Sequence, residues 1–286
     1  MKKQVIGGNK ARAFLIFKMF FLIVLLLAYM VPFFLILINS FKRKSTVIKE
    51  PLVLIDPKGI TLENFINAFK QMNYPLAFLN SLIISVISVT FIIIFAAMAA
   101  YVFVRTKWAA SKFFFALMIA SMVVPFQVLM IPLVSIYGSS LGMLNSKSSL
   151  IFFYLGFGMN LAVFMYHGFI KSSVPISLEE AAKLDGCTKF QTFFLVVLPL
   201  LKSITSTMIV LDVLWIWNDF LLPSLVLGKK ELYTLPLSTY SFYGTYSNDL
   251  GKIMAGLVMT VLPVIALYLF LQKHIISGIV SGAVKS

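Results

Sequence analysis

The stretch Glu179–Ser203 reads EEAAKLDGCTKFQTFFLVVLPLLKS, and long apolar runs flank it. Ser177 and Glu180 have the spacing of a capping box, and Gly186 supplies a helix stop, so we expect a helix of about two turns here. A second short helix is predicted from about Thr188 to Val197. So short a helix is marginal in water unless something packs on it. The pattern therefore indicates either a docking helix for another protein or an amphipathic helix at the lipid headgroups.

The rest of the chain is too apolar for a soluble domain. Of its 286 residues 60% are hydrophobic, and the mean hydropathy is +0.97, whereas soluble domains are about 45–50% apolar. The net charge of +14 comes mostly from lysines that flank apolar runs, which indicates membrane anchors rather than nucleic-acid binding. Cys187 is the only cysteine, so no intrachain disulfide is expected. His167 and His274 are far apart, without nearby carboxylates, so no metal or histidine-based catalytic site is expected either.

Apolar runs of about 20 residues or more predict an all-α integral membrane fold with six transmembrane helices. The first run is too long for a signal peptide core and lacks a cleavage site, so we expect it to be retained. Gly138 and Gly142 are expected to end the third span. The whole chain, 1–286, is interpreted as one transmembrane domain. Its predicted parts are spans at about 14–39, 77–104, 113–137, 149–170, 203–227 and 253–272, a segment at 171–202 between spans four and five, and a tail at 273–286.

The distribution of charge favours both termini inside. With this topology the inner segments hold 14 of the Lys and Arg residues and the outer ones ten, as the positive-inside rule requires. The triplet Lys42-Arg43-Lys44 in the first outer loop opposes this orientation. The segment 171–202 then lies inside.

The opening stretch resembles the E-A-A-(three)-G-(nine)-I-(one)-L-P signature of ABC importer permeases. Glu180-Ala181-Ala182, Gly186 and Leu198-Pro199 match it at the right spacing, and Val196 replaces the isoleucine. In that family the segment is a coupling helix that sits in a cleft of the ATPase subunit. The resemblance therefore implies that these residues couple to an ATPase: Glu179, Glu180, Ala181, Ala182, Asp185 and Gly186.

The resemblance covers nearly the whole chain and narrows to carbohydrate importers of the maltose-transporter type. It is carried by ITLENF, NSLIIS, AAYVFVR, VPFQVLMIPL, LDG, WNDFLLP and LQKHIISGIVSGAVKS. The ending resembles the MalG-type subunit, although Ser286 stands where glycine is usual. That type implies a tail that touches the ATPase through Gly278, Gly282, Ala283, Val284 and Lys285.

The implied assembly is a multi-pass complex in a bacterial cytoplasmic membrane. Its implied members are a second, MalF-like permease, two ATPase subunits and an extracytoplasmic substrate-binding protein, with no nucleic acid. No phosphate loop exists here, because Gly251-Lys252 is followed by Ile253 and Tyr246 holds the first glycine's place. The chain is therefore expected to be no enzyme and to carry no cofactor, with ATP and magnesium bound by the partner ATPase.

Two carboxylates, Asp212 and Asp219, fall within the fifth span, where an aspartate costs about 2.5–3.5 kcal/mol at the helix centre. They are seven residues apart and share a face with Trp215. Either they line a translocation path or they form hydrogen bonds between helices, which we favour for Asp212. The candidate path residues are Trp215, Asn218, Asp219, Asn80 and Gln127.

The outer loop at 229–252 has an aromatic set that is unusual for a loop that contacts nothing. A contact with the substrate-binding protein is expected for Tyr240, Phe242, Tyr243 and Tyr246; the alternative is a solvated connector.

The predicted function is thus a permease subunit of an ATP-driven importer of a sugar, oligosaccharide or related polyol. Two alternatives remain, a permease for a non-sugar solute and a stand-alone secondary carrier, which would predict inverted repeats. The sequence does not identify the sugar.

Overall fold

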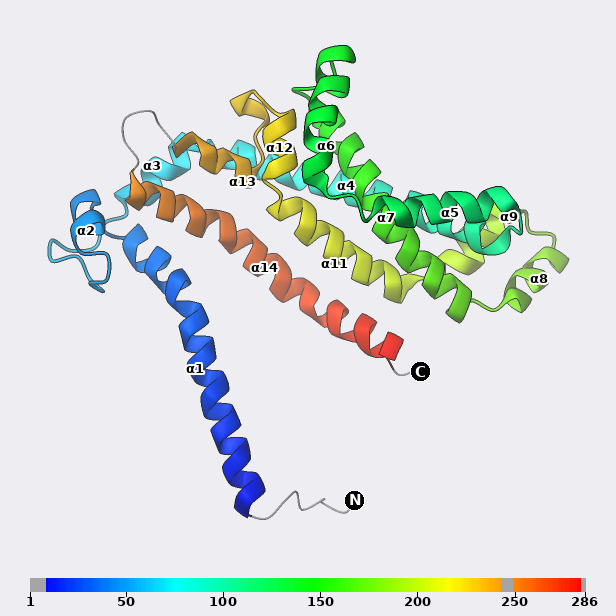
Figure 1. The fold of residues 1–286 in the computed structure, drawn as a ribbon, viewed down its shortest axis with the longest axis horizontal. Helices are drawn as coiled ribbons and strands as arrows, with labels where there is room; N and C mark the ends of the chain where they lie inside the picture. The colour runs from blue at the N-terminus through cyan, green and yellow to red at the C-terminus, as the bar shows by residue number, and fades with distance from the viewer. Residues whose placement is uncertain (1–8, 243–248, 284–286) are drawn as a thin grey trace. The chain divides into compact units, whose positions relative to one another are not determined.

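A computed structural model describes residues 9–242 and 249–283, with side chains placed at 13–242 and 249–270 (Figure 1). Over these residues the chain is helical and contains no strand. It divides into two compact units: residues 1–71 with 242–259, and residues 72–241 with 260–286. We describe each unit separately.

The first unit is built around one long apolar helix and the folded loop that follows it. Its helices are α1 Asn9–Ser40, α2 Lys44–Lys49, α3 Glu63–Gln71 and the first turns of α14 Leu250–Ala283. The buried Asn64 on α3 donates its amide to the carbonyls of Ser40 at 2.9 Å and Lys42 at 2.7 Å, which fixes the exit of α1. Gly251 lies against the same amide, where a Cβ atom would come within 2.7 Å of Nδ2.

The basic triplet that opposed the predicted orientation has an internal role in this loop. Lys42 is 1% exposed and donates to the carbonyls of Glu50 and Pro51, and burial lowers the pKa of its ammonium group. Arg43 donates to the carbonyl of Lys58 at 2.6 Å. Two of the three cations thus stabilise the folded loop. They therefore count for less than free charges when the positive-inside rule is used to orient the chain.

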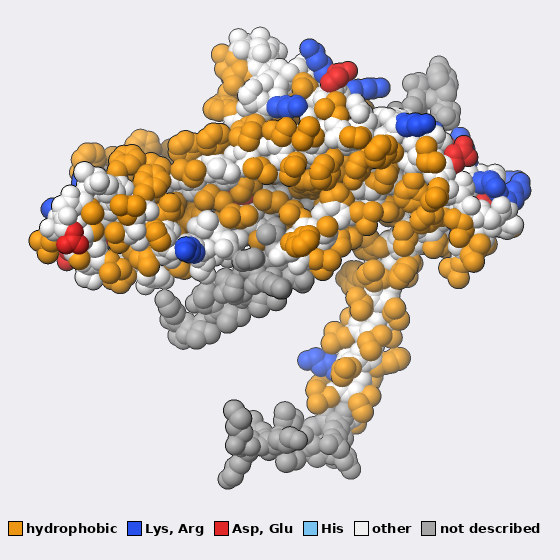
Figure 2. Space-filling view, turned by 180° about the vertical axis from the view of Figure 1, so that it is seen from behind, with side chains coloured by type: hydrophobic (Ala, Val, Ile, Leu, Met, Phe, Trp, Pro, Cys, Tyr) orange, Lys and Arg blue, Asp and Glu red, His pale blue; other side chains and the backbone are white. Residues whose placement is uncertain are grey.

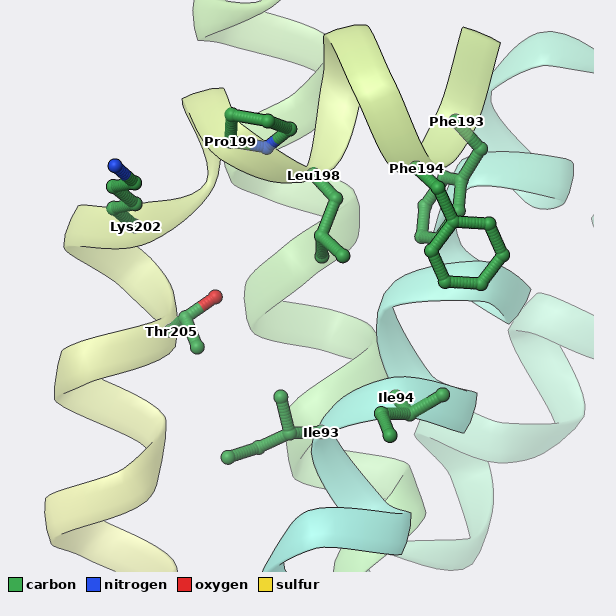
Figure 3. Close-up of a pocket in the computed structure, with 8 residues that line it drawn as sticks. All are labelled: Ile93, Ile94, Phe193, Phe194, Leu198, Pro199, Lys202 and Thr205. Carbon is green, nitrogen blue, oxygen red and sulfur yellow. The ribbon is translucent and has the colours of Figure 1, made fainter. Parts of the chain in front are cut away.

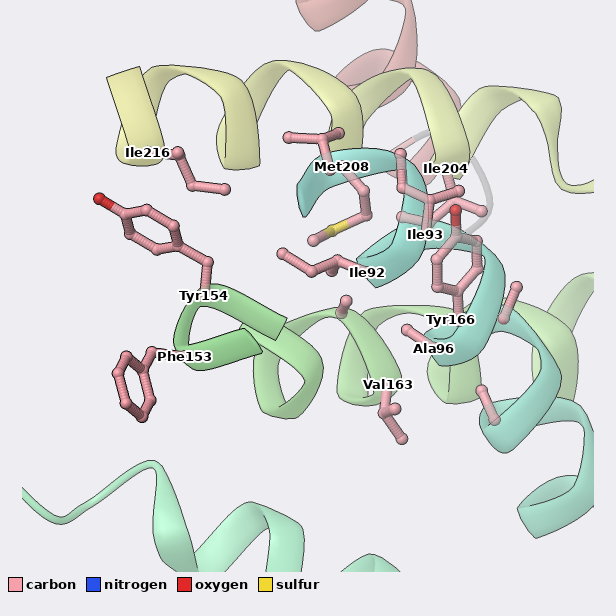
Figure 4. Close-up of a cluster of buried hydrophobic side chains, with 14 of the residues drawn as sticks. Ile92, Ile93, Ala96, Phe153, Tyr154, Val163, Tyr166, Ile204, Met208 and Ile216 are labelled. Atoms are coloured by element: carbon pink, nitrogen blue, oxygen red, sulfur yellow. The ribbon is translucent and has the colours of Figure 1, made fainter. Parts of the chain in front are cut away.

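The second unit has a core of three long helices, α4 Tyr74–Arg105, α7 Lys147–Ser173 and α11 Lys202–Asn218. Side chains of α4 such as Ile92 and Ala96 lie between those of the other two helices, among them Tyr166 and Met208 (Figure 4). The α4 face that packs there carries small side chains, which let helix backbones approach closely in a membrane. The buried small residues are Ala77, Ser81, Ser85, Ser88, Ala96, Ala97 and Ala100.

The span expected over 113–137 is not one continuous helix. The chain instead forms α5 Ala109–Ser121 and then α6 Phe126–Leu133 with the π-helix η1 Val134–Ser140, and the two parts are bent by 98°. The break falls at Pro125, whose missing amide hydrogen interrupts the helical ladder and whose ring disfavours helix at Val124. Gly142 lies in the following loop at φ +62°, as expected, whereas Gly138 does not end the helix, because it lies inside η1.

The span expected over 203–227 is also broken. α11 ends at Asn218, and Asp219 adopts an extended conformation before α12 Leu221–Val226. The segment that follows forms three short helices, η3 Lys230–Leu232, α13 Leu235–Ser238 and η4 Thr239–Phe242. They are tied to α4, because Asn80 donates to the carbonyls of Glu231 and Tyr233, and Ser81 accepts from the amide of Leu235.

Over the described residues, four helices are long and apolar enough to cross a membrane, or six if each bent pair is one span. Hydrophobic side chains cover most of the face seen in Figure 2, as a lipid solvent requires. The predicted ends of the spans at 14–39, 77–104 and 149–170 agree with α1, α4 and α7 to within five residues. The last span runs on past 272 as α14, which continues to Ala283.

Candidate functional site

The predicted helix within the opening stretch is present as α8 Ile176–Leu184. Its predicted capping box is wrong. Pro175 is the N-cap residue, and no side chain caps the helix. Proline fixes φ near −65° and so starts the helix before Ser177, whose hydroxyl then lies inside the first turn rather than ahead of it.

The predicted stop at Gly186 is confirmed. The residue has φ +83°, in the left-handed region that favours glycine. The amide of Gly186 bonds the carbonyl of Lys183, and the amide of Cys187 bonds that of Ala182 at 3.0 Å, so the turn satisfies the last carbonyls of α8. No atom lies within 4 Å of a Cβ placed on Gly186. Glycine is therefore favoured here by the left-handed backbone conformation and not by a lack of room for a side chain.

The second short helix begins as predicted at Thr188, and its cap was missed. Thr188 and Gln191 form a complete capping box: each side chain accepts from the other residue's amide. The spacing T-x-x-Q was the sequence signal for it. The segment continues as α9 Lys189–Gln191, the π-helix η2 Thr192–Val197 and α10 Leu198–Leu200, and it meets α11 at 77°.

α8 has an inward and an outward face. Glu179 and Ala182 point inward: Ala182 is buried where α8 packs on η2, and Glu179 is held by two side chains of α4. Glu180, Ala181 and Leu184 are exposed, and Leu184 is 89% exposed. Ile176, one turn before Glu180, is also 58% exposed.

The candidate path residues fall into one connected group and several separate ones. Asp219 accepts from the Tyr154 hydroxyl at 2.9 Å and from the amide of Leu221 at 2.9 Å, so it also caps α12. Tyr154 packs edge-on against Trp215, with ring centroids 5.5 Å apart. Tyr154 thus links Trp215 to Asp219. Sequence reasoning missed it because nothing local marks a buried tyrosine as a partner of a carboxylate 65 residues away.

Asn80 is fully buried, and its side-chain amide donates to the carbonyls of Glu231 and Tyr233, so it has a structural role in addition to any role in a path. Gln127 and Asn218 are exposed. The Oδ2 atom of Asp212, a residue only 3% exposed, has no hydrogen-bond partner among the described residues. The hydrogen bond between helices favoured for Asp212 is therefore not formed by that oxygen.

One cavity of about 430 Å³ lies between α4, the segment η2–α10 and α11 (Figure 3). Thr205 and Lys202 are the polar residues of its lining. Few donors and acceptors are available there for sugar hydroxyls, which makes it a poor sugar site. The other lining residues are Ile93, Ile94, Phe193, Phe194, Leu198 and Pro199.

Of the outer aromatic set, Tyr240 is 56% exposed and Phe242 is buried. Tyr243 and Tyr246 lie outside the described residues. Of the predicted tail contacts, Gly278, Gly282 and Ala283 fall on the backbone of α14, where no side chains are placed, and Val284 and Lys285 lie beyond the described residues. Their contacts stay predictions. Within the described part of the chain no three His, Cys, Asp or Glu residues gather as metal ligands would.

The long apolar helices indicate a multi-pass membrane protein. Residues 90–280 match the family described as binding-protein-dependent transport system inner membrane component. The chain belongs to that family.

Similar proteins narrow the class further. The chain is 43% identical to the probable starch degradation products transport system permease protein AmyC of Thermoanaerobacterium thermosulfurigenes, over 92% of this chain and 94% of that protein. It is 37% identical to the multiple sugar-binding transport system permease protein MsmG of Streptococcus mutans, over 90% of this chain and 92% of that protein. The melibiose/raffinose/stachyose import permease protein MelC of Bacillus subtilis is 36% identical, over 90% of this chain and 92% of that protein. The resemblance to carbohydrate importer permeases is thereby confirmed.

Proposed function

We propose that the chain is a permease subunit of an ATP-driven, binding-protein-dependent importer of a sugar or oligosaccharide in a bacterial cytoplasmic membrane. The observation that carries this is the exposed outer face of α8, with Glu180, Ala181 and Leu184, on a chain of this family. A separate ATPase docks on that face and supplies the energy. A second, MalF-like permease completes the path.

The shape of the opening stretch supports docking over an interfacial helix. An interfacial helix needs an apolar face against lipid and a polar face against water. The outward face of α8 instead intermixes the charged Glu180 with the exposed apolar side chains of Ile176 and Leu184 and with the small Ala181. The small Ala181 admits a partner surface closely, while Glu180 meets a basic residue of that partner. Phe190, 66% exposed on α9, extends the same docking surface.

The substrate class is proposed from the relatives and from the outer end of the second unit. The exposed Trp215 ring, with Asp219 behind it through Tyr154, suits sugar ring faces and hydroxyls. The exposed Tyr240 is proposed to contact the substrate-binding protein, and the chain's tail the ATPase. The N-terminus and tail then lie on the cytoplasmic side with α8.

Reconstitution tests the proposal. The chain is co-expressed with the products of its neighbouring open reading frames, purified, and placed in proteoliposomes with the binding protein. Radiolabelled maltotriose and raffinose are the probes, chosen from the relatives' names. We expect ATP-dependent accumulation by the complex and neither ATPase activity nor accumulation by the chain alone.

Gradient-driven uptake by the lone chain would instead identify a secondary carrier. ATP-driven uptake of an amino acid, with neither sugar transported, would identify a permease for another solute.

A further inference from the structure

Arg105, the last residue of α4, lies at the corner where α7 ends and α8 begins. Its Nη2 donates to the carbonyl of Val174 at 2.8 Å, and both its Nε and Nη2 lie 2.7 Å from Oε1 of Glu179. Tyr101, one turn earlier on the same face of α4, donates its hydroxyl to Oε2 of Glu179 at 2.9 Å. Both oxygens of that carboxylate are therefore held by α4.

The surroundings make these contacts stronger than a surface ion pair. The side chains of Arg105 and Glu179 are 17% and 12% exposed, so solvent and salt screen them little. Val174 caps the C-terminal end of α7, where unpaired carbonyls and the helix dipole favour a cation. Glu179 lies in the first turn of α8, where the dipole favours an anion. The planar guanidinium group serves both helix ends at once through donors held in a rigid fork.

The same contacts reach the second half of the segment. The Tyr101 ring packs against Phe193 of η2, with centroids 5.3 Å apart, and Phe193 is buried. One end of α4 thus contacts the end of α7, the start of α8 and the π-helix that precedes α11.

We propose that Arg105 and Tyr101, with Glu179, form a clamp that makes α8 move together with α4. A push on α8 then reaches the centre of the three-helix core directly, and not only through the short turn at Pro175 that joins α8 to α7. Glu179 is accordingly an internal positioning residue, and its neighbour Glu180 is the carboxylate presented to the ATPase. This inference rests on the proposed function, because it assigns the route by which that docking surface acts.

The experiment compares Arg105→Gln with Lys107→Gln in the reconstituted complex. Lys107 is an exposed cation at the same end of α4 and serves as the matched control. We measure ATPase co-purification, ATP hydrolysis, and molecules of the accumulated probe sugar per ATP hydrolysed. For Arg105→Gln we expect the ATPase to remain bound and to hydrolyse ATP, and transport per ATP to fall several-fold. Lys107→Gln should match the wild type.

Two further variants guard against a simple folding defect. Tyr101→Phe removes one hydrogen bond and keeps the ring against Phe193, so transport per ATP should fall less. Arg105→Gln combined with Glu179→Gln leaves no unpaired buried charge. Its loss should be no larger than that of Arg105→Gln alone, because both changes remove one shared interaction.

The outcomes separate the two proposals. Unchanged transport per ATP in Arg105→Gln and in the double variant, with the ATPase bound, overturns the clamp. Loss of ATPase binding in these variants also overturns it, because the contacts then build the docking surface rather than transmit its movement. If the wild-type chain binds no ATPase at all, the proposed function itself has failed.

Discussion

Helices α1 and α4 are both 32 residues long, and each passes as a membrane span, yet they differ in what covers them. No side chain in the most apolar stretch of α1 is buried, whereas 39% of the corresponding stretch of α4 is. α4 has a face of serines and alanines that lies against α7 and α11. In contrast, large side chains are exposed on all sides of the described part of α1. Apolarity thus identifies a span, and the small residues identify the helix around which others pack.

The sharpest test of this difference truncates one large side chain on each helix. Ile92 on α4 is fully buried, and Leu26 on α1 is 59% exposed. Ile92→Ala should destabilise the chain by about 2–5 kcal/mol because it opens a cavity in the core. Leu26→Ala should change stability by less than about 0.5 kcal/mol. Thermal unfolding of the purified chain in detergent measures both, and equal losses would refute the distinction.

A second test adds a large side chain on the buried face and on the exposed face of one helix. On α7, a Cβ atom at Gly158 would lie 2.6 Å from the Ile92 side chain and 3.3 Å from Trp215, whereas one at Gly156 would meet nothing within 4 Å. Gly158→Leu should cost about 1–3 kcal/mol through overpacking. Gly156→Leu should be tolerated. The yield of monodisperse protein after detergent extraction compares them; a Gly156 variant that fares as badly would show that α7 packs on both faces.

The smallest expected effect concerns the loop between the two helices. The amides of Arg43 and Lys58 donate to Asp56 at 2.9 Å each and lower the pKa of its carboxyl group. Because the folded pKa is the lower one, this contribution is complete above the ordinary value of about 3.9 and is lost as the pH falls through the folded value. Both amides should exchange hydrogen faster in Asp56→Ala at neutral pH, and the ratio to wild type should approach one only as the pH falls through the folded pKa, below the ordinary value. A ratio independent of pH would rule out the carboxylate as the anchor.

The sequence predicted those features that depend on local chemistry. Apolar runs gave α1, α4 and α7, and the left-handed turn at Gly186 followed from glycine itself. The prediction of continuous helices failed at Pro125 and Asp219, where a single residue interrupts an otherwise continuous apolar run. Hydropathy averaged over a window cannot register such a break.

The candidate site divides in the same way. The stretch around α8 was recognisable from its signature, while the side-chain partners of Glu179 and Asp219 lie at least 65 residues away in the chain. Arg105 and Tyr154 could be paired with them only after α4, α7 and α11 were packed together. The assignment of Asn80 to a path likewise overlooked its hydrogen bonds to the segment around Glu231 and Tyr233.

The central claim is that α8 and the turn after it form the ATPase docking surface, and substitution of Gly186 tests it most directly. At φ +83° valine is strained by about 1–3 kcal/mol, whereas asparagine tolerates this conformation and meets no neighbouring atom. Co-purification of the ATPase and ATP-driven sugar uptake are measured together. Gly186→Val should insert in the membrane but lose ATPase binding or uptake, and Gly186→Asn should retain most of both. Wild-type binding and uptake in Gly186→Val would contradict the account.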